Sequence, residues 1–290
     1  MGGHSRGCWP LSETTHVPRA ISFTLDLEDY ALCGTTAPLD RSVDAILAAA
    51  AAAGARGTVF VVGELAERRP DLVARCHDAG HEIGLHGYRH VPIDQLGPAG
   101  LRDDVLRGRD VVESITGERI LGYRAPLFSI TPATSWAPAI LAEIGIRYSS
   151  SVLPAANPIR GFPGAPRGAF RWKSGLVEFP CPVGGVGRMR IPFLGGVYLR
   201  YLPMTLVRHL AKRSPVDPQW LYCHPYDVDE TGIALALPHA GRATTWVLGR
   251  RRRGCAHRIT QVLSLGSAGS PLGEIAAAIG ELAEFPRPVA

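Results

Sequence analysis

The chain has 290 residues, of which 46% are hydrophobic and 20% are charged. This composition excludes intrinsic disorder as the default state, and the length suits one large α/β domain or at most two small ones. The net charge of +5 is mild. Since no basic stripe is interleaved with aromatic residues, we expect no nucleic-acid partner.

Apolar segments and helix-like segments alternate along the first half of the chain. The expected strands are 20–27, 57–63, 81–86, 120–124 and 146–149, and the helices between them are 41–53, 64–79, 101–116 and 131–144. Short links between alternating strands and helices are typical of βαβ units. We therefore predict an α/β fold, a distorted (β/α)7-type barrel with parallel strands, plus a C-terminal helical tail.

The second half of the chain has a looser pattern. It predicts a hairpin from 170–172 and 177–180, a glycine-rich loop over 184–196, a short helix over 205–212, a last strand over 220–223 and a helix over 272–285. Arg188 and Arg190 in the loop are candidates to meet a phosphate, although a solvated loop is at least as common. For the block Arg250–Arg253 we favour a solvated helix start or loop, and the alternative is a contact with anionic lipid, a lipid pyrophosphate or a nucleotide.

The cysteines and the N-terminus bear on location. Six cysteines are scattered without a CxxC pair, which predicts neither a cysteine zinc site nor a disulfide framework and favours a reducing compartment. The N-terminus lacks a continuous apolar segment, and no run of about 18 apolar residues occurs. We expect a cytoplasmic protein with no transmembrane segment.

Acidic residues directly follow the first expected strand. Asp26, Glu28 and Asp29 stand there within four positions, and burying them is costly unless they have partners. Taken alone, such a cluster is more often a turn or a helix cap. Parallel strands nevertheless place sites at their carboxyl ends, so the other strand ends decide between these readings.

Three other strand ends also carry chemically active side chains. His86 and His90 follow the third strand, and two histidines four positions apart can bind one metal. Arg124 follows the fourth strand and could hold a carboxylate through paired hydrogen bonds. His224 follows the last strand with Asp227 close by, as suits a general acid oriented by a carboxylate. Each of these, alone, is more often structural.

The joint order of these four elements resembles the polysaccharide deacetylases, also called the NodB-homology domain or carbohydrate esterase family 4. The resemblance runs from about Ala20 to Asp229. Within the family the sequence is most similar to a branch associated with bacterial exopolysaccharide gene clusters, whose first motif is DVEDY-like. The matching segments are Asp26–Tyr30 (DLEDY), Arg124–Ser129 (RAPLFS) and His224–Asp227 (HPYD). We expect 1–19 to be a loosely ordered leader, 20–230 to be the catalytic domain, and 231–290 to be a C-terminal extension packed on it.

The resemblance implies a hydrolase that removes an N-acetyl group from an amino sugar with the help of a divalent metal. Zinc is the expected metal, with cobalt, nickel, manganese and iron as alternatives. His86, His90 and one acid would hold it, leaving positions open for water and substrate. Strand alternation favours Glu28 as that acid, because it lies on the same face as Asp26, and Asp29 is the alternative if the chain turns at once.

The resemblance also implies roles for the remaining site residues. Asp26 is similar to the family's catalytic base, Arg124 to the residue that holds it, and His224 to the acid that protonates the departing amine. Leu221 is similar to the residue that lines the acetyl-methyl pocket. The remaining residues expected to contact substrate are Tyr88, Pro126 and Asp227.

The sequence departs from the family pattern at two places. Leu27 follows Asp26, where the usual first motif has two adjacent aspartates. Serines follow Tyr148, where the similar branch carries an aspartate. If that aspartate orients the acid histidine, Asp227 is the candidate to replace it.

Three alternatives stay open on the sequence. A deformylase of a formamido sugar uses the same chemistry, and acetate against formate release separates the two. A metal-free ureide hydrolase is disfavoured by the presence of both histidines, and a non-catalytic carbohydrate-binding relative by the intact polar set. The expected partner is an amino-sugar-containing small molecule or glycan, with a lipid-linked carrier reached from the membrane surface as one option.

Overall fold

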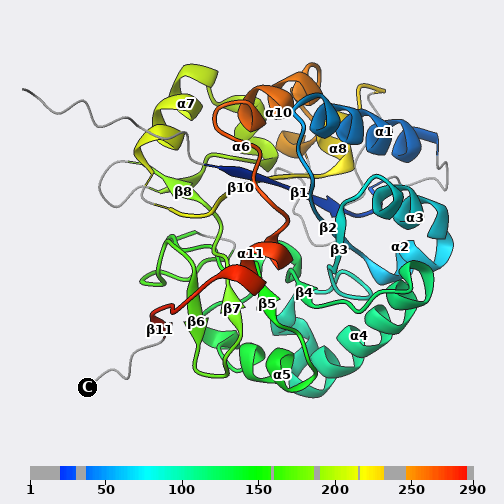
Figure 1. Ribbon diagram of the computed structural model, residues 1–290, viewed down its shortest axis with the longest axis vertical. Helices are drawn as coiled ribbons and strands as arrows, with labels where there is room; N and C mark the ends of the chain where they lie inside the picture. The colour runs from blue at the N-terminus through cyan, green and yellow to red at the C-terminus, as the bar shows by residue number, and fades with distance from the viewer. Residues whose placement is uncertain are drawn as a thin grey trace, which may run out of the picture.

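A computed structural model describes residues 20–30, 37–157, 160–185, 190–214, 216–231 and 246–285 (Figure 1). The expected leader 1–19, two of the cysteines and Arg188 lie outside these residues. Arg190 is described and exposed.

A mostly parallel sheet forms the centre of the molecule. Its strands are β1 (Ile21–Leu27), β2 (Gly57–Val61), β3 (Glu82–Leu85), β4 (Gly122–Tyr123), β5 (Tyr148–Ser149), β6 (Phe170–Trp172), β7 (Val177–Glu178), β10 (Gln219–Cys223) and β11 (Glu284–Phe285). They lie in the order β10-β1-β2-β3-β4-β5-β7-β6-β11. All neighbours from β10 to β7 pair in parallel, and only the β6–β7 pair is antiparallel. A separate small hairpin joins β8 (Val183–Gly184) to β9 (Ile191–Pro192).

Helices surround this sheet (Figure 1). The α-helices are α1 (Ala37–Ala52), α2 (Gly63–Arg68), α3 (Pro70–Asp78), α4 (Ile93–Thr116), α5 (Ala137–Glu143), α6 (Gly196–Tyr201), α7 (Met204–Arg213), α8 (Pro225–Val228), α10 (Cys255–Leu263) and α11 (Leu272–Ala278). Two 3-10 turns, η1 (Pro126–Phe128) and η2 (Pro132–Thr134), follow β4. The predicted parallel α/β architecture is confirmed. In the described part of the chain, β10 and β11 are the two edges of the sheet, and no strand pairing closes it into a complete barrel.

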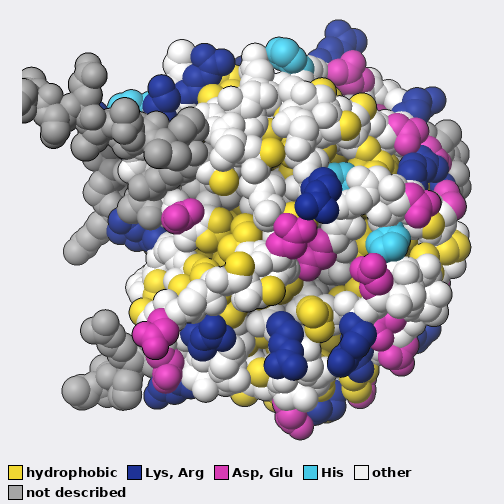
Figure 2. Space-filling view, in the orientation of Figure 1, with side chains coloured by type: hydrophobic (Ala, Val, Ile, Leu, Met, Phe, Trp, Pro, Cys, Tyr) yellow, Lys and Arg dark blue, Asp and Glu magenta, His cyan; other side chains and the backbone are white. Residues whose placement is uncertain are grey.

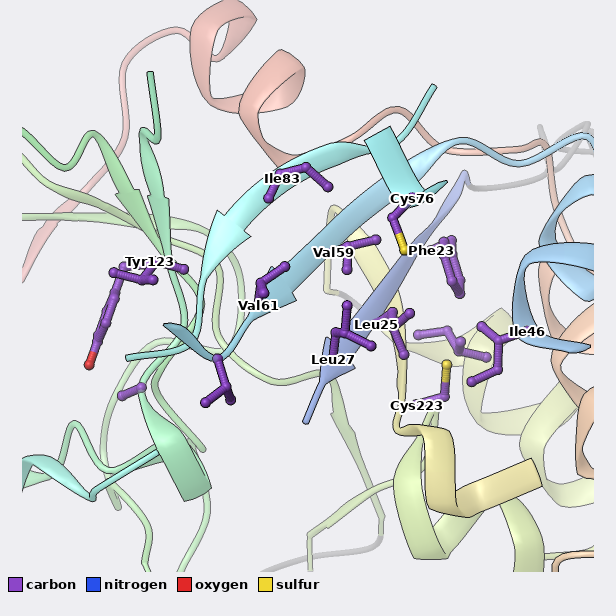
Figure 3. Packing of buried hydrophobic residues seen from close by; sticks show 14 of the residues in the cluster. Phe23, Leu25, Leu27, Ile46, Val59, Val61, Cys76, Ile83, Tyr123 and Cys223 are labelled. Carbon is purple, nitrogen blue, oxygen red and sulfur yellow. The ribbon is translucent and has the colours of Figure 1, made fainter. Parts of the chain in front are cut away.

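The two faces of β1 are buried against different partners, because successive side chains point in opposite directions. On β1, Phe23, Leu25 and Leu27 pack outward against the helices, in the layer that Figure 3 shows. The opposite face carries Thr24 and Asp26, both buried. The sheet therefore has an apolar outer layer and an inner layer that can hold polar chemistry.

Helix α11 covers the inner layer at the amino ends of the strands and lies in front in Figure 1. The backbone N–H of Leu272 donates to Thr58 Oγ1 at 2.8 Å, and that of Gly273 donates to Glu82 Oε2 at 2.9 Å. Thr58 and Glu82 stand near the starts of β2 and β3, so α11 caps the end opposite to the strand ends discussed below.

Several predicted boundaries need correction, and proline or glycine explains most of them. The expected helix 64–79 is two helices, because the residue before a proline is disfavoured in the α conformation and Arg69 precedes Pro70. Helix α4 begins earlier than predicted and is kinked at Gly97, just before Pro98. The expected helix 131–144 begins as a 3-10 turn, and its α-helical part starts only at Ala137.

The predicted tail helix 272–285 is wrong in its second half. Helix α11 ends at Ala278, Ile279 is extended and Gly280 follows. Beyond it, Phe285 in β11 pairs with β6 and packs its ring against Phe170 and Trp172 at centroid distances of 5.2 and 5.6 Å. Tertiary packing of one aromatic ring thus overrides the helical pattern.

Charge on the visible surface is mixed. In Figure 2, lysine and arginine side chains stand in separate groups, with aspartate and glutamate side chains among them. Among the described residues no helix is long and apolar enough to cross a membrane. The arginine block is not uniformly solvated: Arg252 is buried and its Nη1 lies 3.3 Å from Asp229 Oδ2, whereas its neighbours are exposed.

Candidate active site

The polar residues predicted from the sequence meet at the carboxyl ends of four strands. Asp26 lies near the end of β1, and His86, Arg124 and His224 directly follow β3, β4 and β10. Carboxyl ends of neighbouring parallel strands lie along one edge, which explains why residues far apart in the sequence converge.

Asp26 and Arg124 form a buried ion pair. Arg124 Nη1 donates to Asp26 Oδ1 at 2.5 Å and to Thr24 Oγ1 at 2.9 Å. Burial raises the pKa of Asp26, but the opposing effects of Arg124, His86 and His224 are together larger. The pKa of Asp26 therefore lies below its usual value. The carboxylate is therefore kept ionised in a site from which water is largely excluded.

The guanidinium of Arg124 is itself held on all sides. Its Nη2 donates to Ser150 Oγ at 3.0 Å and its Nε to the Ser150 carbonyl at 3.2 Å. The rings of Phe60 and Trp220 lie 4.2 and 4.4 Å from its Cζ, at cation–π distance. Ser150, one of the serines noted above as a departure from the family pattern, thus fixes the arginine.

His86 presents a defined nitrogen to the site. Its Nδ1 lies 2.7 Å from the carbonyl oxygen of Arg124. A carbonyl can only accept, so Nδ1 carries the proton and the Nε2 lone pair faces Asp26 Oδ2, 4.0 Å away. Burial lowers the pKa of His86 to about 4, which leaves the ring neutral at pH 7, as metal ligation requires.

Glu28 and His90 complete a three-ligand cluster with His86. His90 Nε2 lies 2.7 Å from Glu28 Oε2, and one ligand atom from each of the three residues lies within 4.8 Å of the others. Although burial opposes ionisation, His90 lowers the pKa of Glu28 to about 2. Two imidazoles and one carboxylate are a common set for catalytic zinc, so the residues present fit a divalent cation.

The loop after β3 is shaped to bring His90 back toward Glu28. Gly87 has a φ of +75°, which favours glycine, and His90 itself has a φ of +56°. Asp104 of α4 is buried and accepts hydrogen bonds from the backbone N–H groups of Tyr88 and Arg89 at 2.7 and 3.3 Å. This anchor offsets the cost of the unusual conformation at His90.

His224 faces Asp26 from the other side of the site. Its Nε2 lies 3.6 Å from Asp26 Oδ2, while its Nδ1 and its backbone N–H lie 3.0 and 2.9 Å from Asp227 Oδ2. Burial lowers the pKa of His224, but Asp227, Glu28 and Asp26 outweigh it and raise the pKa to about 9. The ring of Tyr226 stacks on His224 at 4.6 Å.

Two predicted substrate contacts do not face the site. Leu221 is fully buried in the outer layer with Phe23, because alternation along β10 points residues 220 and 222 inward instead. Tyr88 is also buried; its hydroxyl donates to Glu67 at 2.8 Å and Arg107 covers its ring. Both side chains therefore have packing roles.

Tyr222 is an inward-facing residue beside His224 that was not predicted from the sequence. Its ring lies 5.9 Å from that of His224 and 5.5 Å from that of Phe128. The same period-two rule that placed Glu28 beside Asp26 would have selected Tyr222, two positions before His224, over Leu221.

Asp29 and Pro126 lie at the margin of the site. Asp29 Oδ2 accepts from Arg68 at 3.1 Å, and Asp29 is not in the three-residue cluster, so Glu28 is the better placed acid. Pro126 is buried at the start of η1 and lies beside Gly87.

Comparison with known proteins assigns this fold and site to a class. Residues 17–149 match the family model of the polysaccharide deacetylases, and residues 150–267 match a model described as a domain of unknown function, DUF3473. The segment 17–149 therefore belongs to the polysaccharide deacetylase family. The narrower exopolysaccharide branch stays a prediction.

Individual relatives agree with this assignment. The chain is 28% identical over 133 residues to the peptidoglycan-N-acetylglucosamine deacetylase of Bacillus cereus, covering 46% of each chain. It is 28% identical over 99 residues to a Shewanella sediminis protein named for a 4-deoxy-4-formamido-L-arabinose-phosphoundecaprenol deformylase, covering 33% of this chain and 32% of the relative. The chain thus spans less than half the length of these curated relatives.

A solved structure shares the fold over the whole chain. It comes from Mycobacterium smegmatis and is named for a polysaccharide deacetylase. The TM-score is 0.59 at 22% identity, with 100% of this chain and 99% of that chain covered. At this identity the likeness shows the fold alone.

Proposed function

We propose that the protein is a metal-dependent hydrolase that removes the N-acetyl group from an amino sugar. The observation that carries the proposal is the convergence of three ligand atoms from Glu28, His86 and His90 beside the Asp26–Arg124 pair, with His224 opposite. Hydrolysis of an amide needs an activated water, a stabilised oxyanion and a proton for the departing amine. The arrangement can meet all three needs.

Glu28, His86 and His90 would hold the cation, which would acidify a water molecule and polarise the acyl carbonyl. Asp26, ionised at neutral pH, would accept the proton of the attacking water. Arg124 would keep Asp26 in place through its own fixed contacts. His224, protonated because of its raised pKa, would donate a proton to the sugar nitrogen as the carbon–nitrogen bond breaks.

Zinc is the proposed cation, because two histidines and one carboxylate are typical of catalytic zinc sites. Cobalt, nickel, manganese or iron could replace it in the same ligand set. Metal analysis of protein purified without added metal, followed by reconstitution of chelator-treated protein with each ion, tests this choice.

The proposed substrate is an amino sugar in a glycan precursor, a lipid-linked or nucleotide-linked carrier, or a small glycoside. A cytoplasmic location belongs to the same proposal, and four described cysteines that are all free and buried support it.

Acetate release from N-acetylglucosamine oligomers and from UDP-N-acetylglucosamine tests the proposed activity. We expect release that depends on added metal and is lost in His86→Ala. A protein that binds these sugars but releases no acetate or formate, with metal loaded, would instead be a non-catalytic relative.

Removal of a formyl group is the second candidate, and the similarity to the Shewanella sediminis deformylase favours it. The ligands and the proton-transfer residues would be the same. Formate in place of acetate, from matched N-formyl and N-acetyl sugars, would select this candidate.

A further inference from the structure

We propose that Arg200 is a positioning residue for the acid histidine, acting through Asp227. Its expected effect on kcat rests on the proposed function. It also gives a role to the region matched by the domain of unknown function, since Arg200, His224 and Asp227 all lie in 150–267.

Arg200 and His224 contact different oxygens of the Asp227 carboxylate. Arg200 Nε, from α6, lies 3.0 Å from Asp227 Oδ1, while Asp227 Oδ2 lies 3.0 Å from His224 Nδ1. The side chains of Arg200 and Asp227 are 0% and 1% exposed. The buried ion pair at Oδ1 and the hydrogen bonds at Oδ2 together limit rotation of the carboxylate, so Nδ1 of His224 keeps its partner in one orientation. Nε2 then stays directed at Asp26.

Arg200 is fixed in turn by a segment that follows much later in the chain. Its Nη1 donates to the carbonyl oxygens of Leu248 and Arg250 at 2.8 and 2.5 Å. The neighbouring Tyr201 hydroxyl donates to the Val247 carbonyl at 3.1 Å. One guanidinium therefore links the acid side of the active site to the 246–250 segment.

The serines that follow Tyr148 do not supply the carboxylate that contacts His224. Ser150, which stands among the serines where the similar branch was expected to carry an aspartate, donates to the Phe179 carbonyl at 3.1 Å and accepts from Arg124. It offers no carboxylate to His224. The orienting carboxylate comes from α8 (Pro225–Val228) instead, where Asp227 Oδ2 also accepts the backbone N–H of His224 and leaves Oδ1 to Arg200.

The test is a double-mutant cycle on kcat with R200M, D227N and the combined variant, in the full chain loaded with zinc. If Arg200 acts through Asp227, R200M lowers kcat roughly tenfold or more with little change in KM. This loss of kcat should be smaller than that of H224A, which removes the acid itself and should lower kcat roughly 100-fold or more. Adding R200M to D227N then causes no further loss, because coupled residues are not additive.

R109M is the matched control. Arg109 of α4 also donates to a backbone carbonyl, that of Ile144 at 2.7 Å, and lies away from the proposed site. We expect its kcat to match that of the unaltered protein. R200K keeps the cation without the forked geometry and should fall between the unaltered protein and R200M; it carries the test should R200M not fold.

A spectroscopic readout separates this proposal from the proposed function. The imidazole proton shared between His224 Nδ1 and Asp227 should give a downfield NMR resonance that persists in R109M and is lost or displaced in R200M and D227N. That result with no hydrolysis of any amide sugar would retain the Arg200 link and remove the proposed function. An unmoved resonance in R200M, or losses in kcat that simply multiply in the combined variant, would overturn the role of Arg200.

Discussion

His224 Nε2 lies 3.6 Å from Asp26 Oδ2, although the two residues belong to segments matched by different family models. The boundary between those models therefore passes through one site and does not separate two functions. The proposed base and metal ligands come from the first segment, and the proposed acid comes from the second.

Separate removal of a ligand and of the base should have different effects. His86→Ala should empty the metal site and abolish turnover, because it deletes one of three donors. Asp26→Asn should lower kcat by roughly 100-fold or more while the protein keeps its metal. Metal content by mass spectrometry and kcat on one sugar amide measure the two effects. An Asp26→Asn protein with undiminished kcat would remove Asp26 from the role of base.

The pH profile of kcat should reveal the support that Asp227 gives to His224. Asp227 helps to raise the pKa of His224 to about 9 against the effect of burial, so activity should decline as pH rises through about 9. In D227N the charge of Asp227 no longer offsets the effect of burial, so the pKa of His224 should fall. The alkaline limb of the profile should therefore move to lower pH. Profiles of both proteins between pH 5 and about 10 test this. An alkaline limb that stays in place would contradict it.

The raised pKa of His224 also makes the folding stability depend on pH. His224 has a folded pKa above its ordinary value of 6.5, so its contribution is fully present below pH 6.5 and is lost as pH rises through about 9. Urea unfolding at pH 6 and at about pH 10 should show a smaller loss of stability in D227N than in the unaltered protein.

Neighbouring residues of β10 should separate packing from substrate contact. Leu221→Ala should lower the free energy of unfolding by about 2–5 kcal/mol, because Leu221 is fully buried in the outer layer, and leave KM nearly unchanged. Tyr222→Leu should change KM, because its ring faces the site. Urea unfolding and steady-state kinetics distinguish the two. The opposite pattern would restore Leu221 to the substrate pocket.

The capping helix α11 should stabilise the fold without touching the chemistry. Leu272 is fully buried at the amino ends of the strands, so Leu272→Ala should lower the free energy of unfolding by about 2–5 kcal/mol. Metal affinity should be unchanged, because the ligands lie at the carboxyl ends. Loss of metal binding in the folded variant would show that the two ends of the sheet are coupled.

The features that could be predicted from the sequence are those that local patterns encode. Alternation of strands and helices indicated the parallel sheet, and short motifs at strand ends indicated Asp26, His86, His90, Arg124 and His224. Helix α10 was missed although Cys255, Ile259 and Val262 repeat at helical spacing. The apolar spacing could therefore have predicted this helix from the sequence.

Other features depend on contacts between distant segments, which no local pattern contains. The support of Asp227 by Arg200 and the packing of Phe285 against β6 are of this kind. Arg200 sits in a helix of six residues whose only distinguishing feature is what it touches after folding.

The most direct test of the central claim is anomalous diffraction at the zinc edge from crystals of the zinc-loaded protein. We predict one ion bound by Glu28, His86 and His90, with Asp26 and His224 beside it and not among its protein ligands. Zinc bound elsewhere with these three residues left apart, or no zinc bound at saturating concentration, would contradict the account.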